Sequence, residues 1–268
     1  MYIGYSYEGV FGPFNTSHPG AIADSAVWKV KDCFYMFGGI SPLGFLGELW
    51  AYNYTSDQWA FMGNRTTAYG TMGIPSATNW PPERHGGSAW IVNDVAYMYG
   101  GHSIITTCTA YYISNTYIII DFNDLWIWNN TLWTWIGGSS VSSSADATYA
   151  DYSKWSSENY PMAASNMLHW TDNDNLWLYG GRGVYQSLGD LWVYNTHLGK
   201  WAWLLSNVTV PAKRYGAGTA LVNSTLVLYG GYDTVNTSTS YVLSDMWRLN
   251  FTRFNITGKY NLILFLMN

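Results

Sequence analysis

Few side chains in this sequence are spaced for catalysis. The histidines lie far apart along the chain and show no close metal-ligand spacing: His18, His85, His102, His169 and His197. The sequence also contains no nucleophile elbow and no glycine-rich phosphate loop. We therefore expect no catalytic residue, no metal ligand and no bound cofactor, and we expect the function to be binding.

The side chains that suit binding are aromatic and charged residues outside the predicted strands. Trp80 and Trp155 fall in connections, whereas the other 14 of the 16 tryptophans fall in predicted strands, where they serve mainly for packing between sheets. Glu83 and Arg182 lie in similar connections. Local packing of the two loop tryptophans is the alternative that the sequence leaves open.

Four copies of one sequence unit position these candidates. Each copy has a predicted strand that ends in two glycines: Gly38-Gly39, Gly100-Gly101, Gly180-Gly181 and Gly230-Gly231. An acidic residue, an apolar residue and a tryptophan follow each pair: Glu48-Leu49-Trp50, Asp124-Leu125-Trp126, Asp190-Leu191-Trp192 and Asp245-Met246-Trp247. A proline lies at the same offset before each pair: Pro19, Pro81, Pro161 and Pro211.

Each copy is expected to form four short strands, because apolar and polar residues alternate over short runs bounded by turn residues. The glycines end the second strand, where a tight exit needs a positive φ or a close backbone approach. The fourth strand carries two aromatic residues spaced by one, weakly so in the last copy: Trp59/Phe61, Trp133/Trp135, Trp201/Trp203 and Phe254/Ile256.

These equivalent positions in the four copies, called columns below, resemble those of a kelch-repeat β-propeller, as in the central domain of galactose oxidase. The resemblance implies an all-β, single-domain fold in which each copy is one four-stranded blade. The copies span about 18–63, 81–138, 161–206 and 211–257, with 1–17 as the remnant of a preceding repeat and 258–268 as an atypical tail. We expect an incomplete propeller; the alternative is a closed four-blade ring in which residues 1–6 add a strand beside the last copy.

Length variation among the copies indicates which end of the blades binds. Twelve positions separate the first glycine from the strand-three tryptophan in copies one and three, but 26 do in copy two and 17 in copy four. These two-three connections and the four-one connections between copies emerge at the same end of a four-stranded meander. Variable loops on a rigid scaffold are the usual place for binding. Trp80, Glu83, Trp155 and Arg182 lie in these connections.

The resemblance adds Arg84 and Arg214 to the ligand-binding candidates, since in some kelch proteins an arginine in this column lines the ligand pocket. The alternative is an arginine that donates hydrogen bonds to loop carbonyls. The acidic column is expected to cap the turn before strand three: Glu48, Asp124, Asp190 and Asp245.

Composition restricts the partners. The net charge is −5 and only 11% of residues are charged, so the chain lacks the basic stripe of a nucleic-acid-binding surface. The terminal LILFLM run is too short to span a membrane, and we expect no membrane insertion. A protein or a glycan is the expected partner.

Glycosylation sequons favour an extracellular or secretory-lumen protein, although no signal peptide is recognisable and a cytoplasmic location is the alternative. The candidate sites are Asn15, Asn53, Asn64, Asn129, Asn207, Asn223, Asn236, Asn250 and Asn255. Turns that are rich in Asn and Thr for structural reasons would also contain such sequons. Whether Cys33 and Cys108 form a disulfide stays open, because nothing in the sequence fixes their geometry.

We expect a non-enzymatic module that presents the two-three and four-one loops to a protein or a glycan. Two alternatives follow from the resemblance. One is the propeller part of a carbohydrate-active oxidase or a sugar isomerase whose catalytic residues lie elsewhere, since neither Cys33 nor Cys108 lies in a recognisable copper-radical site. The other is an intracellular kelch adaptor scaffold.

Overall fold

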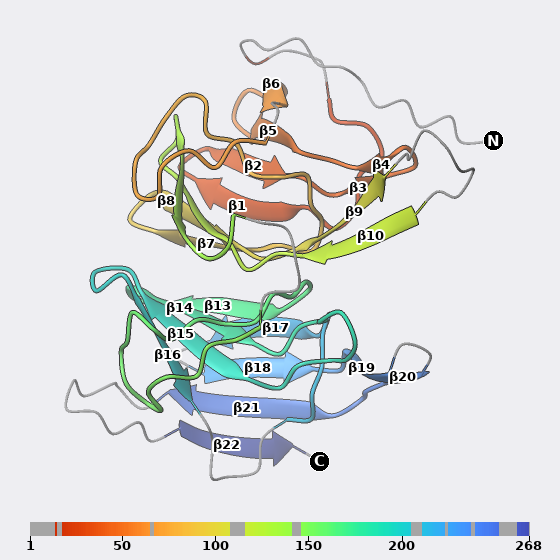
Figure 1. The fold of residues 1–268 in the computed structure, drawn as a ribbon, viewed down its shortest axis with the longest axis vertical. Helices are drawn as coiled ribbons and strands as arrows, with labels where there is room; N and C mark the ends of the chain where they lie inside the picture. The colour runs from red at the N-terminus through yellow and green to blue at the C-terminus, as the bar shows by residue number, and fades with distance from the viewer. Residues whose placement is uncertain are drawn as a thin grey trace. The chain divides into compact units, whose positions relative to one another are not determined.

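In the computed structural model the chain is all-β (Figure 1). The structure describes residues 14, 18–64, 67–107, 116–140, 146–204, 211–222, 225–236, 239–251 and 262–267. Within these ranges, no helix is long and apolar enough to cross a membrane.

Four antiparallel sheets have four strands each, and the strands are added in chain order from one edge to the other. Blade 1 contains β1 (Ala26–Val30), β2 (Cys33–Phe37), β5 (Glu48–Asn53) and β6 (Gln58–Asn64). Blade 2 contains β7 (Ser88–Val92), β8 (Val95–Tyr99), β11 (Leu125–Trp128) and β12 (Trp133–Gly137). Blade 3 contains β13 (Leu168–Asp172), β14 (Asn175–Tyr179), β15 (Leu191–Asn195) and β16 (Lys200–Leu204). Blade 4 contains β17 (Gly218–Val222), β18 (Thr225–Tyr229), β21 (Met246–Phe251) and β22 (Leu262–Met267).

These sheets confirm the predicted fold class, an all-β chain of four-stranded β-propeller blades. The chain divides into two compact units, Met1–Ser143 with blades 1 and 2 and Ser144–Asn268 with blades 3 and 4. The strand positions follow from the repeated columns: each glycine pair comes directly after the second strand, and each acidic-apolar-Trp step opens the third.

Tryptophans form the core of each unit. In the first unit, the ring of Trp28 lies 6.1 Å from that of Trp133 in an edge-to-face contact, and Phe37 lies 5.2 Å from the same indole, so blade 1 packs on blade 2. In the second unit, the stacked pair Trp170 and Trp177 belongs to a buried cluster that includes Trp247 of blade 4. Such aromatic pairs add to the free energy gained by burying their area.

The glycine pairs connect neighbouring blades. Gly38 has a φ of 68°, and a Cβ there would lie 2.2 Å from the carbonyl oxygen of Arg84 in the next blade. Gly39 N donates to that same oxygen at 2.7 Å. In the second unit, a Cβ on Gly180 would lie 2.3 Å from the carbonyl oxygen of Arg214. The predicted reasons for glycine, positive φ and close backbone approach, are therefore both confirmed.

Three of the four two-three connections form a small hairpin of their own. These hairpins are β3 (Ile40–Ser41) with β4 (Gly44–Phe45), β9 (His102–Thr107) with β10 (Thr116–Asp121), and β19 (Tyr232–Asn236) with β20 (Thr239–Val242). In the third copy, whose connection has the same length as that of the first, a bridge between Arg182 and Ser187 holds the connection instead. The described parts of the long insertion of copy two thus form a two-stranded β-ribbon.

The four-one connections that enter blades 2 and 3 share one conformation despite different sequences. The equivalent backbone pairs are Ala68 with Trp80 and Ser76 with Trp133 in the first unit, and Thr148 with Tyr160 and Ser156 with Trp201 in the second. Each connection runs along the free edge of the fourth strand of its blade. A buried asparagine fixes each loop: Asn79 and Asn159 donate from Nδ2 to loop carbonyls.

The fourth strand of blade 4 differs from the expectation. The predicted positions, Phe254 and Ile256, lie outside the described residues, as do residues 1–6. The strand that pairs with β21 is β22, in register from Met246 opposite Met267 to Phe251 opposite Leu262. The terminal sequence LILFLM is a continuous apolar run of strand length, which explains why it takes this place.

Candidate functional site

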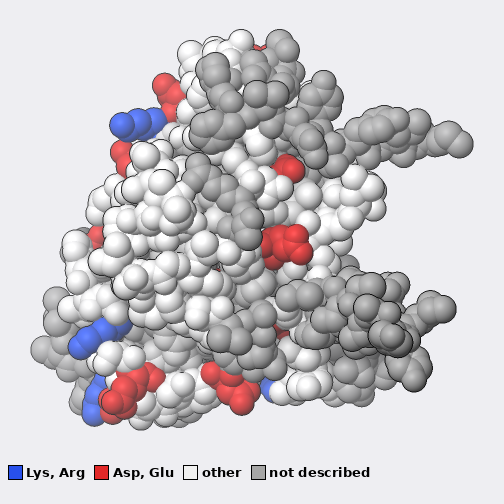
Figure 2. Space-filling model, turned by 45° about the horizontal axis from the view of Figure 1, so that its top comes forward, with Lys and Arg blue, Asp and Glu red and all other residues white. Residues whose placement is uncertain are grey.

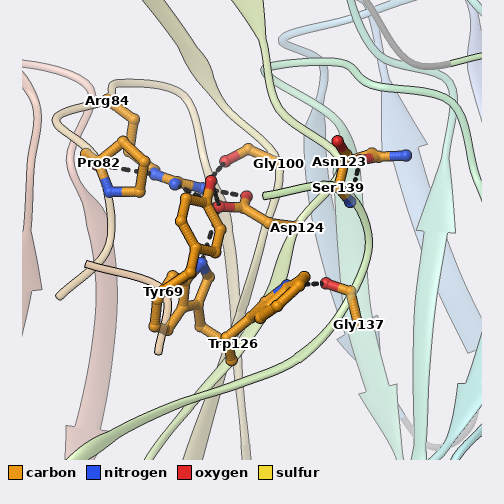
Figure 3. Close-up of polar contacts among 10 residues, drawn as sticks. Tyr69, Pro82, Arg84, Gly100, Asn123, Asp124, Trp126, Gly137 and Ser139 are labelled. Atoms are coloured by element: carbon orange, nitrogen blue, oxygen red, sulfur yellow. Dashed lines mark hydrogen bonds and ion pairs between the residues drawn. The ribbon is translucent and has the colours of Figure 1, made fainter. Parts of the chain in front are cut away.

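Arg84 lies at the centre of a buried polar network in the first unit (Figure 3). Its Nη1 and Nη2 donate to Asp124 Oδ1 and Oδ2 at 2.6 and 2.7 Å, which is a two-point ion pair. Nη1 also donates to Gly100 O at 2.9 Å, and Nε to Pro82 O at 3.1 Å. The N–H groups of the guanidinium therefore donate hydrogen bonds to acceptors inside the protein.

The carboxylate of Asp124 accepts two further hydrogen bonds, from Tyr69 Oη at 2.7 Å and Trp126 Nε1 at 2.8 Å. Burial acts to lower the pKa of Arg84, but the charge and hydrogen bonds of Asp124 and Tyr69 outweigh it and raise that pKa. Burial, together with the charge of Asp124, raises the pKa of Tyr69. The raised pKa values keep the Arg84 guanidinium charged and the Tyr69 phenol neutral at neutral pH.

Arg84 also links two blades through its backbone. Its N–H donates to Leu46 O at 3.0 Å and its carbonyl accepts from Gly39 N, both in blade 1, while its side chain binds Asp124 in blade 2. We call this arrangement the arginine clamp. It is a structural element, because every one of these groups contacts protein rather than an open surface.

The arginine clamp recurs in the second unit. Arg214 Nη1 and Nη2 lie 2.7 Å from Asp245 Oδ1 and Oδ2, and Nη1 donates to Gly230 O at 2.9 Å. Hydrogen bonds from Arg214 lower the pKa of Asp245, against a smaller opposing effect of burial. The side chain of Arg214 is fully buried, whereas that of Asp245 is 30% exposed.

These contacts correct two expectations. Arg84 and Arg214 are committed to ion pairs, in addition to the carbonyl contacts that the sequence left as the alternative. The acidic column does more than cap a turn: Asp124 and Asp245 pair with the arginines. Glu48 accepts from Trp50 Nε1 at 2.8 Å, and Asp190 accepts from Tyr149 Oη. The two acidic residues of this column that have no arginine partner thus each accept a hydrogen bond from an aromatic N–H or O–H group.

Trp80 was expected to lie outside the packing columns, and that expectation is wrong. Trp80 is 3% exposed, donates from Nε1 to Gly47 O at 2.8 Å and packs against Phe37 at 6.2 Å. Its equivalent in the second unit is Tyr160, another aromatic residue before a proline. Trp155 is half-buried against the core of the second unit.

Glu83 and Arg182 are the two sequence-based candidates that remain exposed. Arg182 belongs to a further repeated feature, a pair of residues that exchange two backbone hydrogen bonds at the end where the two-three and four-one connections emerge. One partner follows the glycine pair and the other lies four positions after the repeated proline. The pairs are Ala23 with Ile40, His85 with His102, Ser165 with Arg182, and Tyr215 with Tyr232. We call them the face pairs.

The face pairs combine one backbone geometry with very different side chains. Their N–O distances fall between 2.7 and 3.0 Å in all four blades. Their side chains, in contrast, differ from blade to blade: two aliphatic groups in blade 1, two imidazoles in blade 2, a serine hydroxyl and a guanidinium in blade 3, and two phenols in blade 4. Sequence reasoning found only Arg182 among them, although the fixed offsets from proline and glycine could have identified all eight.

Exposed apolar side chains are frequent in the connections that carry the face pairs. Of the 20 large hydrophobic residues that are exposed among those described, 12 lie in two-three or four-one connections. These are Ile40, Leu43, Met72, Ile74, Ile119, Tyr149, Tyr152, Tyr185, Tyr232, Val235, Tyr241 and Val242. Each unit therefore presents exposed apolar and aromatic side chains on its two-three and four-one connections.

The described residues contain no group of three or more His, Cys, Asp or Glu arranged to hold a metal ion. Cys33 is a free thiol whose Sγ lies 3.8 Å from Asn53 Nδ2, and Cys108 lies outside the described residues. Burial lowers the pKa of His169, which lies in β13 with Nδ1 3.1 Å from Met167 O, as expected for a structural histidine.

The blade topology, the blade-linking glycines and the tryptophan-rich cores place the chain in the β-propeller class. No family model and no curated protein matches the sequence.

Proposed function

We propose that this protein is a kelch-type binding module whose face pairs and surrounding loops recognise a protein or a glycan. The observation that carries the proposal is the constancy of the face-pair backbone against the diversity of its side chains. A binding scaffold holds its main chain fixed and varies the side chains that it presents. In blades 2 and 4, the arginine clamps directly precede a face-pair residue in the chain and hold its main chain in place.

In the second unit, two loops of neighbouring blades are joined by hydrogen bonds. Ser187 N donates to Thr234 O at 2.9 Å, and Thr234 N donates to Ser187 Oγ at 2.7 Å, so the blade 3 loop and hairpin β19–β20 are joined. Tyr215 and Tyr232 stack with their rings 5.6 Å apart. Tyrosines held in this way lose little conformational entropy on binding, which favours affinity.

The chemistry of the surface favours contacts through aromatic rings and hydrogen bonds over charge. Among the described residues on the side drawn in Figure 2, charged side chains are few and scattered. Hairpin β19–β20 carries tyrosine, threonine and serine side chains, the residue types that adaptable recognition surfaces favour. A neutral protein epitope or glycan fits this surface better than a nucleic acid does.

The proposal is tested by screening the purified chain against a glycan array and a panel of purified extracellular protein domains. Any binder is then measured with Tyr185→Ser and with Tyr241→Ser, which change residues exposed by 73% and 56% in blades 3 and 4. The matched control is Leu198→Ser, because Leu198 is 53% exposed but lies in the turn between β15 and β16. We expect at least tenfold weaker binding for the two loop variants and unchanged binding for the control. Equal loss in all three variants, or loss only in Leu198→Ser, would place binding elsewhere.

A further inference from the structure

The face pair of blade 2 lies in a cluster of two Asp–His dyads in the first unit. His85 Nδ1 lies 2.8 Å from Asp24 Oδ2, and His102 Nδ1 lies 2.8 Å from Asp121 Oδ1. The two imidazoles meet edge to face with centroids 5.3 Å apart, and Phe45 stacks on His85 at 5.2 Å. The sequence spacing gave no sign of this cluster, because hairpin β9–β10 and a backbone pair bring distant residues together.

The carboxylates select the tautomer of both rings. A carboxylate that accepts from Nδ1–H leaves the lone pair of a neutral imidazole on Nε2. Among the described residues, no protein group bonds to the Nε2 atom of His85 or His102. A carboxylate behind a histidine is also the usual outer-shell arrangement of metal-binding imidazoles, since it orients the ring and raises its basicity.

The spacing of the rings agrees with a shared ion. A tetrahedral Zn²⁺ with Zn–N bonds of about 2.0–2.1 Å places the centroids of two imidazole ligands roughly 5 Å apart. The centroids of His85 and His102 are 5.3 Å apart. The backbone holds this distance, because His85 N donates to His102 O at 3.0 Å and His102 N to His85 O at 2.9 Å.

Both imidazoles and one of the two carboxylates are largely shielded from water. The side chains of His85, His102 and Asp121 are 15%, 11% and 3% exposed, whereas that of Asp24 is 41% exposed. The stacked ring of Phe45 limits the motion of His85. A histidine pair held in one orientation loses less entropy on chelating an ion than two mobile side chains do.

We propose that His85 and His102 bind a divalent transition-metal ion, Zn²⁺ or an ion of similar ligand preference, through their two Nε2 atoms. Asp24 and Asp121 act as positioning residues behind the ligands. Since no third protein ligand is placed there among the described residues, water or an external ligand completes the coordination. Imidazole ligands disfavour Mg²⁺ and Ca²⁺, which prefer oxygen. The proposal does not depend on which macromolecule the loops bind.

The test is a titration of tag-free, EDTA-treated protein with Zn²⁺ alone, followed by calorimetry, and with Co²⁺ alone, followed by visible absorption. We expect saturable binding of one Zn²⁺ per chain and none of Mg²⁺. His85→Gln and His102→Gln should each weaken Zn²⁺ binding at least tenfold. Asp121→Asn should weaken it by about 10–100-fold while both ligands remain, which a purely structural Asp121 would not do.

The matched control is His197→Gln. His197 Nε2 also lies near a carboxylate, 3.1 Å from Asp174 Oδ2, but its side chain is 71% exposed. This variant should bind Zn²⁺ as the unaltered protein does, and each variant is first shown to melt cooperatively. The proposal is overturned if the unaltered protein takes up no Zn²⁺, or if His85→Gln and His102→Gln bind it as well as His197→Gln does.

Discussion

Arg84 and Asp124, 40 residues apart in the chain, form a fully buried two-point ion pair with N–O distances of 2.6 and 2.7 Å. Removing one partner of a buried pair leaves an uncompensated charge and costs about 3–5 kcal/mol. Arg84→Met should therefore lower the free energy of unfolding by about that amount, as measured by urea denaturation. Asp124→Asn in the same chain should restore part of the loss, because the remaining acceptor is neutral.

Two other arginines serve as controls for this prediction. Arg214→Met should destabilise less than Arg84→Met, because the Asp245 side chain is 30% exposed and can be hydrated. Arg182→Met changes an exposed side chain and should stay within about 0.5 kcal/mol. A loss for Arg84→Met no larger than that for Arg182→Met would refute the clamp.

Trp80 should behave as a core residue. Trp80→Ala is expected to lower the free energy of unfolding by about 3–5 kcal/mol, since a buried aromatic ring is removed and Gly47 O loses its donor. Trp155→Ala should lose less, because Trp155 is only half-buried. Thermal and urea unfolding of both variants measures this order, and a larger loss at Trp155 would contradict it.

Stability should fall in mildly acidic solution because of His169. Burial lowers the pKa of His169 in the folded state below its ordinary value of 6.5, so the unfolded chain binds a proton more readily. The contribution of neutral His169 to the free energy of unfolding is fully present above pH 6.5. It is lost as the pH falls from there toward the pKa of His169 in the folded state. Asp245 has a pKa below its ordinary 3.8 and contributes no change in this range.

The measurement is the free energy of unfolding at pH 7.5, 6.5 and 5.5 for the unaltered chain and for His169→Gln. We expect the variant to have the flatter pH dependence over this interval. The His169 argument fails if both proteins lose stability in parallel.

Gly180 should not tolerate a side chain. Gly180→Ala puts a Cβ 2.3 Å from Arg214 O at a φ of 67°, so the blade-linking contact must open. We expect a loss of more than about 1 kcal/mol. Gly218→Ala is the control, since its Cβ would meet nothing closer than Tyr229 O at 3.9 Å. Equal thermal stability of the two variants would show that Gly180 is replaceable.

We propose that Asn129 carries an N-linked glycan when the chain passes through a secretory pathway. Asn129 is exposed in the turn between β11 and β12, and its Oδ1 accepts from the N–H groups of Thr131 and Leu132 at 3.1 and 2.8 Å. The glycan attaches to Nδ2, so the turn is kept. Asn195 makes the same turn without a sequon and is the internal control.

Intact mass after expression in a secreting eukaryotic host tests this proposal. Thr131→Ala should remove the mass of one glycan, whereas Thr196→Ala, beside Asn195, should change only the mass of the side chain. Secreted protein that loses no glycan mass on Thr131→Ala or on treatment with an N-glycosidase would contradict it.

Most of the fold was predictable from the sequence because it depends on local, repeated chemistry. Gly180 and Gly181 mark a strand end through the conformations that only glycine adopts easily, and the Trp192 column marks the next strand. The position of β22 was harder to predict, because its apolar residues do not alternate and it follows a long connection.

Little of the site was predictable, because it depends on contacts between distant residues. An arginine in two copies and a carboxylate in all four give no sign of the Arg84–Asp124 pairing, since distance along the chain does not fix distance in space. Trp80 was misassigned for a related reason: the loop that carries it looks irregular in sequence, but backbone hydrogen bonds and the Asn79 side chain hold it along β12. The aromatic residue before Pro81 and Pro161 was the available signal.

The loops along β12 and β16 have a further consequence. Gly73 N donates to Trp135 O at 2.8 Å, and Ser153 and Ser156 N–H groups donate to carbonyls of β16 at 3.0 Å. Several backbone acceptors at these strand edges are thus already occupied, which leaves fewer groups for pairing with a strand of a second molecule. The same connections that display exposed apolar side chains protect these two blades from edge-to-edge aggregation.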